Sequence, residues 1–280
     1  DRNRALYGLA QDYLRAGLLD RAESLFYELV EDRDFGQRSR EQLLDIYQQE
    51  KEWEKAVHIA RSVKQFKGQD RKLLLAHFYC EQADEAFASG DAMQTLKIVK
   101  RAFNEDRNNV RAILLEANVH LRNNSPKQAI KSLKRVERQN DEYLPLILEP
   151  LYMAFEQLGN LDEYVEYLCQ LPDDSLSPVL IASEQIQLRE GDEKASSMLC
   201  QALRRRPSLR LVKRLLEVRL HHNSKDAELQ LAQQTLEQFL ADKPVYHCEN
   251  CGFSSRTMHW QCPGCKQWDR VKPIHGIDSD

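Results

Sequence analysis

The sequence predicts an all-α fold, an α-solenoid of helical hairpins that ends in a small cysteine-rich ribbon. Three observations lead to this fold class: helix-breaking residues are scarce, turn residues recur at a nearly constant spacing, and two C-x-x-C pairs lie near the C-terminus. The 280 residues include 10 glycines and 9 prolines, well below the usual combined share of about 12%. Leucine, alanine, glutamine and glutamate, which favour helices, are abundant, so we expect helices through most of the chain.

Turn residues recur along the chain at spacings of 32 to 39 residues, at Gly17, Lys51, Gly90, Asn124, Gly159 and Gly191. Five residues after each turn lies a mostly small residue, at Ala22, Ala56, Thr95, Ala129, Tyr164 and Ser196. A small side chain there lets two helices approach closely, and stacking of neighbouring pairs supplies the core that no pair has alone. The pattern resembles the tetratricopeptide repeat, a pair of antiparallel helices. The alternative is a non-repetitive helical bundle.

The composition changes at Lys243-Pro244, where sheet-like patterning begins. We therefore expect a tetratricopeptide-repeat array of about six to seven hairpins over residues 1–242, with 209–222 and 226–241 as its last helices, and a metal-binding domain over 243–280. The net charge is −4, and no apolar run approaches the roughly 18 residues that a membrane span needs. Because the chain begins at Asp1 inside a helical pattern, we expect it to be part of a longer protein.

Two C-x-x-C pairs separated by ten residues predict one tetrahedral metal site, with the ligands Cys248, Cys251, Cys262 and Cys265. Each pair forms a tight turn that directs two thiolates at one point, and Gly252 suits the positive φ that such a turn needs. Two disulfides are the alternative, disfavoured by three further lone cysteines in a chain without a leader. Zinc and iron both accept four thiolates, so both remain open.

The cysteine-rich segment is too short to build much of a core, so metal binding must supply most of its folding energy. It carries four large aromatic residues, Tyr246, Phe253, Trp260 and Trp268. We expect Trp260 or Trp268 to pack on the last helices, 209–241. The alternative is a free ribbon on a tether.

The chain contains no glycine-rich phosphate loop, no G-x-S-x-G and no H-E-x-x-H, and four protein ligands leave a metal no open position for catalysis. We therefore predict that the protein is not an enzyme. The first helices of a stacked array line a concave groove that binds peptides or proteins. By helical phase, the residues facing this groove are Tyr7, Arg15, Arg38, Arg111, Asn118, Arg122, Gln185 and Arg189.

A basic cluster is the second candidate binding surface. It consists of Arg204, Arg205, Arg206, Arg210, Lys213, Arg214 and Arg219, opposed in this segment only by Glu217. One interpretation is a solvated helix face. The other is a binding site for an acidic partner or for anionic lipid head groups. Nucleic acid is disfavoured in the tail, because residues 243–280 hold five Lys or Arg against four Asp or Glu.

The tail reads Tyr246-x-Cys248-x-x-Cys251-Gly252-Phe253, then Trp260-x-Cys262-Pro263-x-Cys265-x-x-Trp268, then Lys272-Pro273-Ile274-x-Gly276. Joined to helical repeats, this motif resembles the lipopolysaccharide assembly protein B (LapB) family of Gram-negative bacteria. The resemblance covers the whole chain and implies that the four cysteines form a rubredoxin-like metal site.

The resemblance further implies a regulatory adaptor at the cytoplasmic face of the inner membrane, held there by an N-terminal membrane helix that this chain does not include. Family members help the membrane protease FtsH to degrade the deacetylase LpxC, and respond to a membrane partner that senses lipopolysaccharide. The alternatives are a scaffold that assembles lipopolysaccharide enzymes, a rubredoxin-type electron carrier, and a nucleic-acid-binding zinc ribbon. A homodimer is a further expectation, because stacked arrays leave end and edge surfaces open.

Overall fold

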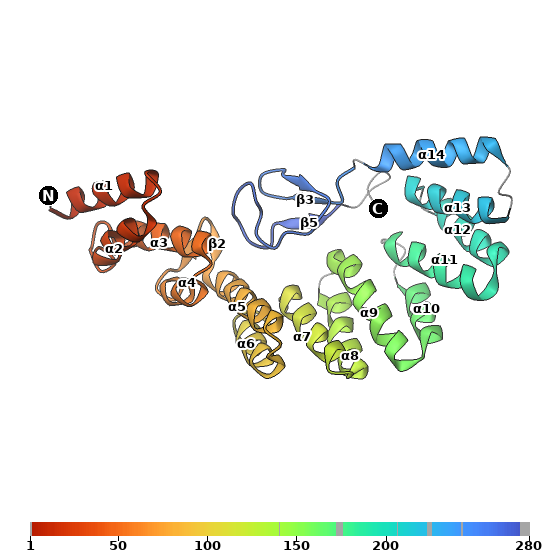
Figure 1. Ribbon diagram of the computed structural model, residues 1–280, viewed down its shortest axis with the longest axis horizontal. Helices are drawn as coiled ribbons and strands as arrows, with labels where there is room; N and C mark the ends of the chain where they lie inside the picture. The colour runs from red at the N-terminus through yellow and green to blue at the C-terminus, as the bar shows by residue number, and fades with distance from the viewer. Residues whose placement is uncertain are drawn as a thin grey trace. The chain divides into compact units, whose positions relative to one another are not determined.

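The computed structural model describes residues 2–139, 141–171, 176–205, 207–222, 226–241 and 243–274. Within these ranges the chain forms consecutive helical pairs followed by a small three-stranded ribbon, which confirms the predicted fold class (Figure 1). The chain divides into two compact units, Asp1–Val119 and His120–Asp280. The predicted division into a repeat array over residues 1–242 and a metal-binding domain over 243–280 stays a prediction.

The first unit consists of three helical pairs and the beginning of a seventh helix. Its helices are α1 (Arg2–Arg15), α2 (Leu19–Glu28), α3 (Gly36–Glu50), α4 (Trp53–Ala60), α5 (Arg71–Ala88), α6 (Ala92–Glu105) and α7 (Val110–Arg122). Helices α1, α3 and α5 pack on α2, α4 and α6, respectively, and α2 and α4 also contact the helix that begins the following pair. Apolar side chains of these helices, such as Leu43 of α3 and Leu74 and Phe78 of α5, are fully buried.

A small β-hairpin lies in the first unit, where the sequence predicted no strand before residue 243. Strands β1 (Gln65–Phe66) and β2 (Gln69–Asp70) pair antiparallel between α4 and α5. The two turn residues, Lys67 and Gly68, both have positive φ, as the tightest hairpin turns require. Phe66 is buried, so the hairpin covers core that the short helix α4 leaves open.

The second unit continues the pairs and ends in the ribbon. Its elements are α8 (Pro126–Gln139), the 3₁₀ turn η1 (Asp141–Tyr143), α9 (Leu144–Leu158), α10 (Leu161–Gln170), α11 (Leu176–Glu190), α12 (Asp192–Arg205), α13 (Leu209–His222), α14 (Ala227–Ala241), β3 (Tyr246–Cys248), β4 (Ser254–Ser255) and β5 (Val271–Pro273). The strands form one antiparallel sheet in the order β4-β3-β5. The predicted last pair of helices is confirmed as α13 and α14.

The six turn residues predicted from the repeat spacing all adopt the left-handed conformation, with φ between 49° and 91°. At five of these turns the next backbone N–H donates to a carbonyl five residues earlier, for example from Leu18 to Tyr13 (2.9 Å) and from Glu52 to Tyr47 (2.8 Å). This bond satisfies a carbonyl that the end of a helix leaves free, and it reverses the chain toward the second helix. The repeat spacing therefore marks the positions where each pair of helices turns.

The small residues five positions later are buried against the neighbouring helices, as predicted. Ala22, Ala56, Thr95 and Ala129 have no exposed surface. Tyr164 is the one large residue of this set, and it is also fully buried. Its hydroxyl donates to the backbone carbonyl of Leu148 at 2.9 Å. A large side chain is accepted there because its polar end has a partner.

Two glycines test the importance of the left-handed turns. An added Cβ would meet no atom within 4 Å at either Gly90 (φ +85°) or Gly8, which lies inside α1 and does not have a positive φ. We expect Gly90→Ala to destabilise the protein by about 1–2 kcal/mol, because an L-residue is strained there. Gly8→Ala should stabilise it by about 0.5–1 kcal/mol through helix propensity. Urea unfolding measures both, and equal effects of the two changes would contradict this account of the turns.

Candidate metal centre

The ribbon brings the four predicted ligand cysteines together. The Sγ atoms of Cys248, Cys251, Cys262 and Cys265 all lie within 4.8 Å of one another. Cys248 Sγ lies 3.8 Å from Cys265 Sγ, and Cys251 Sγ lies 3.6 Å from Cys262 Sγ. A tetrahedral ion with metal–sulfur bonds of about 2.3 Å requires sulfurs about 3.8 Å apart. The geometry therefore fits one thiolate-bound metal, and these separations are far too long for disulfides.

The two C-x-x-C turns have matching backbone conformations. The residue after the second cysteine of each turn has positive φ, 74° at Gly252 and 60° at Lys266. In each turn the N–H of that residue donates to the carbonyl of the first cysteine, at 2.9 Å for both. This closes each turn around its sulfurs. The positive φ predicted for Gly252 is confirmed.

Backbone N–H groups point at the sulfurs and support their ionisation. Burial raises the pKa of Cys248, against hydrogen bonds from the N–H groups of Cys251 and Asn250. Burial likewise raises the pKa of Cys262 to about 12. Burial also opposes ionisation of Cys265, but hydrogen bonds from the Gln267 N–H and the Asn250 side chain lower its pKa to about 7. A cation at the centre supplies the positive charge that lets all four sulfurs ionise.

Gly264 shows how closely the second turn packs on the first. A Cβ added to Gly264 would lie 3.2 Å from Cys251 Sγ and 3.5 Å from Phe253 Cβ. The absence of a side chain at this position therefore allows the two turns to share one centre. Zinc or iron would be held by these four cysteines alone, as a structural centre or, for iron, as one that exchanges an electron.

The ribbon and the whole chain are each similar to known proteins. Residues 246–273 match the family model described as "Rubredoxin metal binding domain". Over 279 residues the chain is 32% identical to lipopolysaccharide assembly protein B of Escherichia coli K12, covering 98% of this chain and 72% of that protein. The chain belongs to the lipopolysaccharide assembly protein B family. A relative of the same name from Haemophilus influenzae Rd is 32% identical, over 95% of this chain and 68% of its own length.

Solved structures with similar folds are more distant. The MamA protein is 14% identical, with a TM-score of 0.41 over 67% of this chain and 95% of that chain. A tetratricopeptide repeat protein from Parabacteroides merdae is 12% identical, with a TM-score of 0.39 over 84% of this chain and 92% of that chain. At these scores neither structure adds to the argument about this LapB-family chain.

The ribbon docks on Tyr143, at the end of η1. Tyr143 and Trp268 are each only 1% exposed, and the Trp260 ring packs against the Tyr143 ring with centroids 5.8 Å apart. The ring contact of Trp260 is therefore with an earlier repeat of the same unit, and the expectation that Trp260 or Trp268 packs on residues 209–241 stays a prediction. The alternative of a free ribbon is wrong, because β5 contacts η1 directly.

Polar groups of the ribbon surround the Tyr143 hydroxyl. It donates to Asp269 Oδ1 and accepts from Lys272 Nζ at 2.7 Å. The Lys272 ammonium also lies 4.1 Å from the Tyr143 ring centroid and 3.7 Å from Glu142 Oε2. Burial, followed by the charge of Asp269, raises the pKa of Tyr143 well above its ordinary value. The hydroxyl therefore stays protonated and keeps its bond to Asp269.

The predicted groove residues divide into exposed, half-buried and buried positions. Arg15, Arg38, Arg122 and Arg189 are exposed, and Asn118 and Gln185 are half-buried. Arg15 pairs with Asp12 at 3.5 Å, and Arg189 pairs with Asp162 of α10. These positions remain candidates for partner binding.

Two predicted groove residues have structural roles instead. Tyr7 is a core residue that packs on Phe26 and Phe35, with ring centroids 5.6 and 5.2 Å away. Arg111 has a side chain only 9% exposed and binds Glu81 of α5 at 2.7 Å as well as Asp84. Burial opposes its charge, but the two carboxylates more than offset this and raise the pKa of Arg111. Both side chains are therefore buried, where helical phase predicted that they face the groove.

The basic cluster is more neutralised than its local sequence indicated. Lys213 pairs with Glu217 at 3.3 Å and with Glu237 of α14 at 3.7 Å. Arg214 binds Glu217 at 3.1 Å, Ser183 Oγ at 3.2 Å and Gln187. Arg204, Arg205 and Arg219 are exposed, Arg210 is half-buried, and Arg206 lies outside the described residues. The exposed arginines and Arg210 stay candidates for an acidic partner.

No helix in the described part of the chain is both long enough and apolar enough to cross a membrane.

Two tyrosines test the docking contact. Tyr143→Phe removes the hydroxyl that bonds to both Asp269 and Lys272 at a buried contact, so we expect a loss of about 1–3 kcal/mol. Tyr152→Phe is the matched control, since its hydroxyl makes one solvent-accessible bond to Glu156 at 3.2 Å, and we expect less than about 0.5 kcal/mol. Urea unfolding of the metal-loaded protein measures both. A Tyr143→Phe protein as stable as the control would show that the hydroxyl does not hold the ribbon.

Proposed function

We propose that this chain is a non-enzymatic adaptor that regulates lipopolysaccharide synthesis at the cytoplasmic face of the inner membrane. The observation that carries the proposal is its membership of the LapB family, with 32% identity over 98% of its length to relatives named for lipopolysaccharide assembly. The stacked helical pairs support it, because such arrays offer long surfaces for protein partners. The metal centre then has a structural part, holding the ribbon that covers Tyr143.

In this proposal the chain brings the deacetylase LpxC to the membrane protease FtsH. An adaptor acts by raising the effective concentration of the substrate beside the protease, without chemistry of its own. A membrane helix preceding Asp1 would confine the encounter to the membrane surface, and a membrane protein that senses lipopolysaccharide would control it. The exposed candidates for these contacts are Arg15, Arg38, Arg122, Arg189 and Arg205, and the half-buried candidates are Asn118, Arg210 and Arg214.

The test is the cellular half-life of LpxC in a strain lacking its own LapB. We expect the 280-residue chain alone to restore little LpxC turnover, and the same chain joined to an unrelated N-terminal membrane helix to restore part of it. The full-length family member is the positive control, and the tethered chain with Cys251→Ser separates tethering from ribbon folding. An untethered chain as effective as the full-length protein would contradict the proximity mechanism. A tethered chain without any effect would contradict the adaptor role.

Electron transfer is the second candidate function, favoured by the match of residues 246–273 to a rubredoxin metal-binding domain. Four thiolates around iron form a one-electron centre. Reversible visible bands in the protein as purified from its own host would support this candidate. A colourless protein containing one zinc per chain would exclude it.

A further inference from the structure

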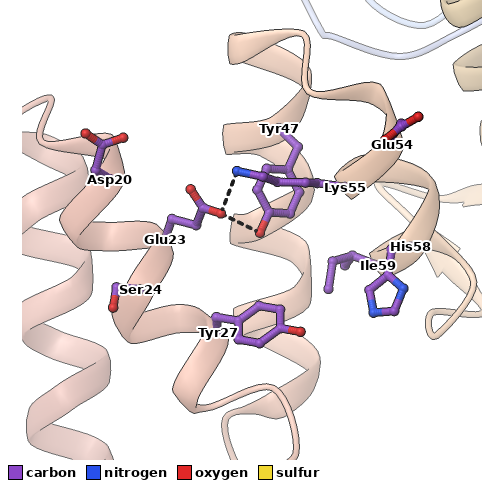
Figure 2. Close-up of a pocket in the computed structure, with 9 residues that line it drawn as sticks. All are labelled: Asp20, Glu23, Ser24, Tyr27, Tyr47, Glu54, Lys55, His58 and Ile59. Atoms are coloured by element: carbon purple, nitrogen blue, oxygen red, sulfur yellow. Dashed lines mark hydrogen bonds and ion pairs between the residues drawn. The ribbon is translucent and has the colours of Figure 1, made fainter.

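A groove lies between α2 and α4 in the first unit, on the helices that follow the turns and not on the first helices where a binding groove was predicted. Its main part is a hollow of about 610 Å³. A second hollow of about 480 Å³ shares Tyr27, His58 and Ile59 with it and extends it past Val30. We call these two hollows together the α2–α4 groove, and Figure 2 shows the residues of the larger one.

One wall of the groove is fixed by hydrogen bonds that connect three helices. Glu23 of α2 accepts hydrogen bonds from the Tyr47 hydroxyl at 3.0 Å and from Lys55 Nζ at 3.1 Å, as Figure 2 shows. The Lys55 ammonium also lies 5.4 Å from the centroid of the Tyr47 ring. Tyr47 is almost fully buried. These bonds join α2, α3 and α4, so the groove is formed in the absence of a ligand.

The floor of the groove is apolar. The Tyr27 ring is 55% exposed, whereas Ile59 is buried beside it. In Figure 2 the ring extends from α2 toward the side of the hollow formed by Ile59 and His58 of α4. A large ring that stays half exposed in the same hollow as an aliphatic side chain offers a surface that an apolar side chain of a partner covers with a gain in free energy.

The upper end of the groove in Figure 2 is acidic, with the carboxylates of Asp20, Glu23 and Glu54 around it. Lys55 is engaged by Glu23, and among the described residues Asp20 and Glu54 have no ion-pair partner. Negative charge is in excess near this end, as the nearby Glu50 shows: burial, followed by the charges of Asp20 and Glu23, raises the pKa of Glu50. A cation brought to this end relieves the repulsion, whereas an anionic lipid or a nucleic acid increases it.

We propose that the α2–α4 groove binds a short segment of a partner protein that carries an arginine or lysine beside an aromatic or aliphatic residue. The cation lies at the acidic end, near Asp20 and Glu54, and the apolar side chain covers Tyr27 and Ile59. The groove is thus a second binding surface of the adaptor proposed above. This inference rests on the proposed function in one respect, that the partner is a protein. A second copy of this chain is the competing occupant.

The probe is a library of short random peptides displayed on phage and selected on the immobilised 280-residue protein. Selection is followed by counter-selection on the triple variant Asp20→Asn, Tyr27→Ala, Glu54→Gln, whose three changed side chains line the groove. We expect the surviving peptides to be enriched in Arg or Lys next to Trp, Phe or Leu. Survivors that are acidic or purely apolar, or no enrichment over the input library, would overturn the proposal.

Binding of the best synthetic peptide, measured by fluorescence anisotropy, gives the quantitative test. We expect Tyr27→Ala, and separately Asp20→Asn with Glu54→Gln, each to weaken binding about tenfold, and added salt to weaken it further. The matched controls are Phe239→Ala and Glu228→Gln, an exposed aromatic and an exposed acid of α14, which should leave the affinity within about twofold. Groove variants that bind like the controls would overturn the proposal.

Sedimentation of the wild-type and triple-variant proteins tests whether a second copy of this chain occupies the groove. A wild-type dimer that the triple variant abolishes would assign the groove to a second copy and overturn the proposal; unchanged sedimentation, with loss of peptide binding, supports it. Because these measurements need neither a membrane nor a protease, their outcome is independent of the LpxC half-life. The adaptor function can fail while the groove still binds its peptide, and the groove can fail while LpxC turnover is normal.

Discussion

The contact between Tyr143 and the ribbon is the interaction on which the C-terminal part of the molecule depends. Its hydroxyl lies between Asp269 and Lys272 of the ribbon, and its ring lies under the Lys272 ammonium and against Trp260. The ribbon has too little apolar surface to fold alone and depends on its four cysteines. Metal binding therefore folds the ribbon, and the folded ribbon buries Tyr143. Through this contact a metal centre with no free coordination position can affect the repeat array.

The contact at Tyr143 also explains why this LapB-family chain combines a helical array with a metal-binding ribbon. A helical array is held together by contacts between neighbouring pairs, so its stability is distributed and local. The ribbon instead joins positions 126 residues apart, because Asp269 binds Tyr143. It thus ties β5 to η1, at the start of α9 in the middle of the array, and adds a long-range constraint to a fold otherwise made of local ones. For the adaptor function proposed above, such a constraint keeps the partner-binding surfaces pre-organised.

The features that the sequence predicts correctly are those set by short-range spacing. The six turn residues and the small residues five positions later depend on one helix turn and its reversal, and the two C-x-x-C pairs depend on one tight turn each. The errors are long-range or rotational. Tyr7 and Arg111 were assigned to the surface, because an error of one residue turns a helical side chain by about 100°. Nothing near Tyr143 in the sequence indicates that residues 269 and 272 will bind it. The hairpin at Lys67-Gly68 was missed because two-residue strands have no periodicity to detect.

The central claim is that the metal-folded ribbon protects the η1 segment of the array. Hydrogen–deuterium exchange of the metal-loaded and metal-free protein tests it most directly, with Cys251→Ser as a second metal-free state and Cys169→Ser, at an exposed cysteine of α10, as the control. We predict that metal removal releases protection in residues 246–273 and also in residues 141–148, while helices such as α5 and α12 keep theirs. Protection at 141–148 that does not change, or a loss that spreads through all the helices, would contradict the claim.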